Sequence, residues 1–111
     1  MMHHKSLADG RWYTLSLAEQ MGNIGSEVHR ALKWQGRDRK QFETAVERTL
    51  ELFDFTLDDP RWKGGRLREI ARAREVFCDA ILGGHAYNSF LEDLDRYFFT
   101  FALLARSRHK V

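Results

Sequence analysis

The spacing of the apolar residues is the feature of this chain that most constrains its fold. In four stretches they recur at the i, i+3, i+4, i+7 positions that form one face of an α-helix. The chain has a single proline and lacks the alternating Val, Ile and Thr runs typical of β-strands. We therefore predict an all-α protein with helices over residues 14–35, 39–57, 66–82 and 90–106. Connections of about three to eight residues favour antiparallel neighbours in an up-down four-helix bundle.

Short motifs indicate where two of these helices begin and how closely one of them packs. Ser16 followed by Glu19 has the form of a capping box, and Asp38 followed by Gln41 has the same spacing. Gly25 lies on the apolar face of the first helix, although a glycine there weakens a helix by up to about 1 kcal/mol. We expect Gly25 to allow another helix to approach closely.

Length, charge and cysteine content exclude several classes of protein. The 111 residues suffice for one domain, 1–111, whose ends at 1–11 and 107–111 we predict to be mobile. A net charge of +2, from 18 basic and 16 acidic residues, is weak evidence for a nucleic-acid partner. One cysteine excludes an intramolecular disulfide and a cysteine-based zinc site. No run approaches ~18 apolar residues, and no signal peptide is recognisable, so we expect a cytoplasmic protein without a membrane partner.

The last predicted helix, 90–106, is apolar on almost every side. Apolar residues cover about half of its circumference, and Phe99 and Leu103 lie outside that arc. A helix in a four-helix bundle keeps one side outward, so a second copy of the chain is the simplest cover for these two side chains. We predict a homodimer through this helix. The alternative is that Phe99 and Leu103 are two ordinary exposed apolar residues.

Arg74 occupies a position where the helical pattern predicts a leucine. It falls near the middle of the apolar arc of helix 66–82. A guanidinium facing a core keeps its charge and needs a partner. We expect a buried or half-buried ion pair, with Asp95 as the first candidate partner and Glu27 as the second. The alternative is an anion-binding residue in a pocket between helices.

A second candidate site is a basic surface formed by residues that are close in the sequence. Six basic residues fall between positions 61 and 74, and we take Trp62, Arg66, Arg68 and Arg72 as the candidate nucleic-acid contacts. On a helix, Arg68 and Arg72 share a face with Glu75 and Asp79, which would neutralise them. A solvated and self-compensated face is therefore the favoured interpretation.

Catalytic and metal-binding patterns find little support in the sequence. No pair of Glu-x-x-His motifs is present, as a di-metal bundle requires, and Glu27-Val-His29 has the wrong spacing. His85 is best explained as a turn residue, and Cys78 as a small core residue. We therefore expect no catalytic residues, no metal and no cofactor.

Several motifs resemble those of known helical proteins. The stretches MGNIGSEV at 21–28, DPRW at 59–62, RLREIARAREVFCD at 66–79 and LEDLDRYF at 91–98 resemble a group of small prokaryotic helical proteins known only as conserved hypotheticals. This resemblance covers roughly residues 12–106 and implies a helical fold and no particular activity.

Size and helix count are also similar to those of HEPN-type bundles, the partners of minimal nucleotidyltransferases and sometimes ribonucleases. The ribonuclease members carry Arg, four to six residues, and then His. Arg106-Ser-Arg-His109 is too short for that motif, so the similarity implies at most a non-catalytic relative.

These observations predict a non-enzymatic helical interaction module, an adaptor or regulatory subunit that acts as a homodimer, with another protein as a candidate partner. The competing hypothesis is a nucleotide- or RNA-binding bundle, the HEPN-like partner in a two-component system. An enzyme is the third possibility.

Overall fold

The computed structural model describes residues 10–84 and 90–109 and contains four α-helices, as the apolar spacing predicts. A short 3-10 helix precedes them. The elements are η1 (Arg11–Thr14), α2 (Leu17–Trp34), α3 (Arg39–Leu57), α4 (Gly65–Ile81) and α5 (Leu91–His109).

Capping decides where the first two α-helices begin. The backbone N–H of Glu19 donates to Ser16 Oγ at 3.1 Å, and the N–H of Ser16 donates to Glu19 Oε1 at 2.9 Å. This capping box is the predicted one, and it places the helix start at Leu17 rather than at residue 14. At α3, Asp38 Oδ1 accepts from the N–H of Gln41 at 3.1 Å.

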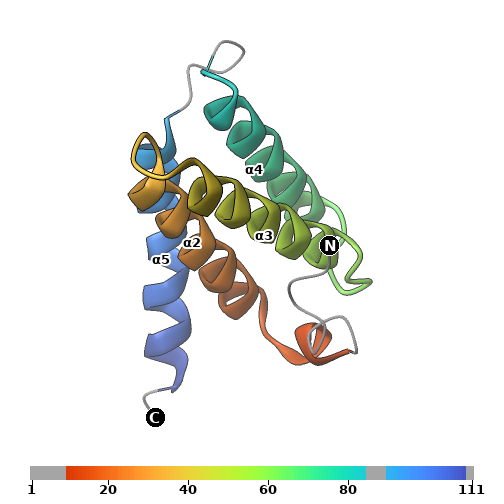
Figure 1. The fold of residues 1–111 in the computed structure, drawn as a ribbon. Coiled ribbons are helices and arrows are strands. Elements are labelled where there is room, and N and C mark those ends of the chain that lie inside the picture. Colours follow the sequence, from red (N-terminus) through yellow and green to blue (C-terminus); the bar gives the residue numbers. More distant parts are fainter. Residues whose placement is uncertain (1–9, 85–89, 110–111) are drawn as a thin grey trace.

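The helices are unequally packed. Successive helices run in opposite directions, and α2 lies between α3 and α5 (Figure 1). Most helix–helix contacts are made by α2 with these two neighbours, whereas α4 contacts α3 modestly and α5 only slightly. The helix α5 therefore depends on α2 for nearly all of its support within the described chain.

Aromatic side chains form the centre of the core. The ring of Phe53 on α3 lies 6.1 Å from that of Phe77 on α4 and 5.9 Å from that of Phe98 on α5. All three side chains are fully buried. One residue of α3 thus links the two helices that hardly touch each other.

Two glycines allow α2 and α5 to approach closely. A Cβ atom added to Gly25 would lie 2.6 Å from Cβ of Phe98, and one added to Gly22 would lie 3.3 Å from Cα of Ala102. The first distance is shorter than the non-bonded contacts that real Cβ atoms make, so Phe98 or the backbone would have to shift. The close packing that we predicted at Gly25 is therefore confirmed, and Phe98 is the residue that requires it.

The ends of the chain and the loop before α5 bear on several predictions. Arg11 lies in η1 and residues 107–109 lie in α5, within the ends for which mobility stays a prediction. Residues 1–9 and 110–111, and His85 in the loop, lie outside the described residues. Within the described part, no helix combines the length and apolar character needed to cross a membrane.

Replacing Gly25 by alanine tests the contact between α2 and α5. The added methyl group collides with Phe98, and overpacking of this kind typically costs about 1–3 kcal/mol. We expect a loss of that size in the free energy of unfolding, measured by urea denaturation followed by circular dichroism. Gly65→Ala is the control, because a Cβ there meets only an arginine side chain at 4.0 Å. Equal stability of the two variants would contradict the assignment.

Candidate functional site

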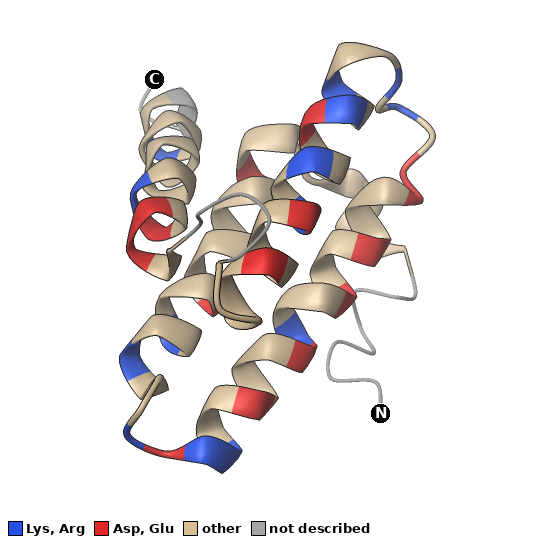
Figure 2. Ribbon diagram, turned by 90° about the horizontal axis from the view of Figure 1, so that it is seen from above, with Lys and Arg blue, Asp and Glu red and all other residues tan. Residues whose placement is uncertain are grey.

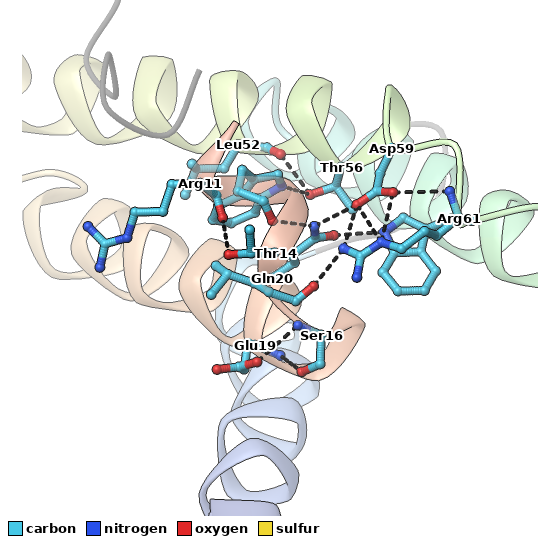
Figure 3. A network of polar contacts seen from close by, with 12 residues as sticks. Arg11, Thr14, Ser16, Glu19, Gln20, Leu52, Thr56, Asp59 and Arg61 are labelled. Carbon is cyan, nitrogen blue, oxygen red and sulfur yellow. Dashed lines mark hydrogen bonds and ion pairs between the residues drawn. The ribbon is translucent and has the colours of Figure 1, made fainter. Parts of the chain in front are cut away.

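A buried network of polar residues is centred on Gln20 (Figure 3). The side-chain Nε2 of Gln20 donates to the carbonyl oxygen of Trp12 and to Asp59 Oδ2, both at 2.9 Å. Its Oε1 accepts from Nε1 of Trp62 at 2.8 Å. Gln20 is fully buried, so this one amide joins η1, α2 and the linker that leads into α4.

The carboxylate of Asp59 is held by a neighbouring arginine. Arg61 Nη2 donates to Asp59 Oδ2 at 2.7 Å and to the carbonyl oxygen of Leu15 at 2.6 Å. The hydrogen bonds from Arg61 hold the pKa of Asp59 below its usual range, against the opposing effect of burial, and Gln20 adds to the lowering. Asp59 is therefore a buried carboxylate that stays ionised.

A third branch of the network reaches α3. Trp12 Nε1 donates to Thr56 Oγ1 at 3.0 Å, and Thr56 Oγ1 donates to the carbonyl oxygen of Leu52 at 2.9 Å. Each polar atom in this branch bonds to another residue of the network. Because the amide, the two indoles and the hydroxyl of this network are buried and bond to one another, the network holds η1, α2, α3 and the linker together.

This network also corrects the predicted basic surface. Trp62 is 9% exposed, and its indole N–H donates to Gln20. The guanidinium carbons of Arg61 and Arg66 lie 4.5 and 5.9 Å from its ring centre. The structure thus places Trp62 inside the network and beneath two arginines rather than on the exposed basic surface to which the sequence analysis assigned it.

Removing the Gln20 amide tests the network. In Gln20→Met the apolar part of the side chain remains, but Trp12, Asp59 and Trp62 each lose a hydrogen bond. A buried polar group without a partner costs about 1–3 kcal/mol, so we expect a loss of at least about 2 kcal/mol in unfolding free energy. Thermal and urea denaturation measure it. Gln41→Met, at an exposed position of α3, is the matched control and should change stability by less than about 0.5 kcal/mol. A stable Gln20→Met protein would show that the amide is dispensable.

Arg74 forms an ion pair, but with an acidic residue that we did not predict. Its Nε lies 3.2 Å from Asp54 Oδ1 on α3, and its Nη1 lies 4.0 Å from Cys78 Sγ. The Arg74 side chain is 35% exposed and that of Asp54 is 63% exposed. The predicted partners are engaged elsewhere: Asp95 pairs with His29 at 3.1 Å and Glu27 with Arg30 at 2.7 Å.

The error about Arg74 has a physical cause in the rotation of α4. The buried residues of this helix include Ala73 and Ala80, whereas Leu67 is 37% exposed. At roughly 100° per residue, the buried face is turned by about 80° from the arc that the larger side chains define. Arg74 therefore lies at the edge of the buried face, beside α3, and its charge is partly solvated.

A hydrogen bond joins α4 and α5 directly. Tyr97 Oη on α5 donates to Glu69 Oε2 on α4 at 3.0 Å. Burial of the phenol and the nearby carboxylate of Glu69 raise the pKa of Tyr97 well above its usual value. Tyr97 thus remains a hydrogen-bond donor. Its partner, Glu69, is one of the acidic residues that lie among the basic residues of α4.

The outer side of α5 carries the candidate interaction surface. Phe99 is 59% exposed and Leu103 is 47% exposed. With Leu104, they are three of the six large apolar side chains that are exposed in the described chain. Both residues that the sequence selected are therefore accessible on this helix.

A groove between α2 and α5 lies beside Phe99. Its volume is about 600 Å³, compared with about 450 and 650 Å³ for two other grooves on the described surface. Glycines and other small residues make up much of its lining, and His29 and Asp95 form a polar group there. The residues that line it are Gly22, Gly25, Ser26, His29, Arg30, Asp95, Phe98, Phe99 and Ala102. The same glycines that admit α5 thus leave a shallow surface into which an apolar side chain could fit.

The remaining basic residues of the predicted surface are exposed. Figure 2 shows the basic residues gathered at turns near opposite ends of the molecule. Arg66, Arg68 and Arg72 are exposed on α4, and Lys63 precedes them. Arg72 has a polar contact of its own, as do Glu75 and Asp79 on the same helix. The other basic turn, Arg37 to Lys40, was missed, although three basic residues among four were visible in the sequence.

The described residues include no group of three or more His, Cys, Asp or Glu side chains that could hold a metal ion. Comparison of the chain with protein-family models, with curated proteins and with solved structures gave no match. The resemblances stated from the sequence remain predictions.

Proposed function

We propose that this protein is a non-enzymatic interaction module, an adaptor or regulatory subunit, built as an up-down four-helix bundle that dimerises through α5. The observation that carries the proposal is the exposure of Phe99 and Leu103 beside the groove between α2 and α5. Contiguous exposed apolar side chains of this kind mark interaction surfaces in proteins. The burial and the mutual hydrogen bonds of the Gln20 network support a structural rather than a catalytic use of its polar groups.

The expected affinity follows from the apolar area that a dimer would cover. At about 25 cal/mol per Å², covering the exposed parts of Phe99 and Leu103 in both copies contributes on the order of 1 kcal/mol for each side chain. Association itself costs at least about 4 kcal/mol. The four side chains therefore only offset this cost, and a dimer that forms at tens of micromolar must also cover the lining of the groove between α2 and α5. We expect a weak dimer, in the micromolar range at the tightest.

Charged substitutions on α5 test the dimer. Phe99→Glu and Leu103→Glu place carboxylates in the proposed interface, where burial of an unpaired charge is strongly unfavourable. We expect the parent chain to sediment as a dimer at tens of micromolar and both variants to sediment as monomers with unchanged helical circular dichroism.

The matched control is Leu82→Glu, because Leu82 is 77% exposed after the end of α4 and outside the proposed interface. This variant should dimerise like the parent. A parent chain that sediments as a monomer at these concentrations would contradict the proposal, as would dissociation of the Leu82 variant to the same degree.

A second candidate function is binding of RNA or nucleotides, as the HEPN-like partner in a two-component system. It is favoured by Lys63, Arg66 and Arg68, which are exposed and form no ion pair with another described residue. It is weakened by Trp62, whose ring is enclosed and offers no face to a base. Phosphate contacts without base stacking would give binding that depends on charge and not on sequence.

A titration with single-stranded RNA at two salt concentrations tests this candidate. If the basic residues contact phosphates, the affinity should fall steeply with added salt and should fall further in Arg66→Glu/Arg68→Glu. Arg37→Glu/Lys40→Glu, at the other basic turn, is the matched control. Absence of binding at low salt, with an absorbance spectrum free of nucleic acid, would eliminate this candidate and leave the interaction module.

A further inference from the structure

The outer side of α5 has a charge pattern that is symmetrical about Phe99. Glu92 lies seven residues before Phe99, and Arg106 lies seven residues after it. Positions seven apart lie nearly above one another on a helix, with a drift of about 20°. All three side chains are exposed. The outer stripe of α5 thus reads acidic, aromatic, basic at equal intervals.

The two charges at the ends of this stripe have no partner within the described chain. The neighbouring Asp93 pairs with Arg96, and Asp95 pairs with His29 across the groove. For Glu92 and Arg106, no hydrogen bond or ion pair to another described residue is present. Both side chains are exposed, so a partner that approaches along α5 can reach them.

We propose that the partner seated on this face is a second copy of the chain, with the two α5 helices antiparallel, Phe99 at the two-fold axis and Glu92 opposite the partner's Arg106. This inference rests on the proposed dimer and specifies its geometry. Glu92 and Arg106 are each seven residues from Phe99. A two-fold rotation at Phe99 therefore places each Glu92 opposite an Arg106 of the other copy, and both pairs form at once.

A parallel arrangement conflicts with the same pattern. It places Glu92 against the partner's Glu92 and Arg106 against the partner's Arg106, so both ends repel. The antiparallel arrangement also brings the amino end of one α5 beside the carboxyl end of the other, which is the favourable orientation of two helix dipoles. Glu92 and Asp93 in the first turn compensate the partial positive charge of this amino end, so the side-chain pairs rather than the dipoles set the orientation.

The groove gives the aromatic side chain at the axis a place to pack. Phe99 lies on its rim, and Gly22, Gly25 and Ala102 contribute little side-chain volume to its lining. The 600 Å³ of the groove leaves room for the partner's Phe99. Because the interface is two-fold, the same contact is made twice, as a closed dimer requires.

Charge-reversal substitutions at Glu92 and Arg106 test this antiparallel register. Glu92→Arg creates two arginine pairs in an antiparallel dimer, and Arg106→Glu creates two glutamate pairs. We expect each single variant to dimerise about tenfold more weakly than the parent in sedimentation equilibrium at low salt. The double variant Glu92→Arg/Arg106→Glu should recover the parent affinity, since it restores both pairs in reverse.

Mixing the two single variants gives an independent readout. In a heterodimer of Glu92→Arg with Arg106→Glu, both ends of the interface are attractive, so the mixture should dimerise more tightly than either variant alone. These differences should shrink at about 1 M salt, where the Debye length is only about 3 Å. Lys40→Glu, an exposed charge reversal on α3, is the control and should have no effect.

The outcomes separate the register from the dimer itself. If the parent chain is monomeric, the proposed function and this inference both fail. If Phe99→Glu dissociates the dimer but the charge variants match the parent, dimerisation through α5 stands and the antiparallel register is wrong. Weakening by the single variants without recovery in the double variant or in the mixture would also overturn the register.

Discussion

The hydrogen bonds of the Gln20 amide are the interaction on which the rest of this structure depends. Gln20 is fully buried on α2 and reaches the backbone of η1 and the side chains of Asp59 and Trp62. These partners lie on both sides of α3 in the sequence, so one side chain fixes where the chain enters α2 and where it leaves α3. Because a buried amide needs all of its partners at once, small displacements of these segments are costly. The position of α4 follows from the linker that the network holds.

Because α2 packs against both α3 and α5, one side of α5 is left without a neighbouring helix in the described chain. One side of α2 packs on α3, and the other side, at Gly22 and Gly25, receives α5. The helix α4 packs against α3 and meets α5 at few points, one of them the hydrogen bond between Glu69 and Tyr97. No element of the described chain therefore covers the side of α5 that carries Phe99 and Leu103. The exposed apolar surface is a consequence of the packing order.

The sequence predicted those parts of the structure that local pattern determines. Helix number, the Ser16 capping box and the close approach at Gly25 follow from spacing within one helix, and the structure agrees with each of them. Contacts between distant residues were not predictable in the same way. Gln20 and Asp59 are 39 residues apart, and nothing in either neighbourhood indicates the other. Arg74 was assigned the wrong partner because large side chains were taken to define the buried face of α4, while the structure buries two of its alanines.

The neighbouring residues Phe98 and Phe99 on α5 have opposite environments, since Phe98 is buried and Phe99 is exposed. Consecutive residues on a helix point about 100° apart, so two adjacent phenylalanines cannot both pack against one neighbouring helix. Phe98 is fully buried against Gly25, and this contact fixes the rotation of α5 about its axis. Phe99 is then directed away from the core by the same contact that buries Phe98. An aromatic residue held in this way on the rim of a groove is accessible without any rearrangement of the fold, so a partner meets a preorganised surface.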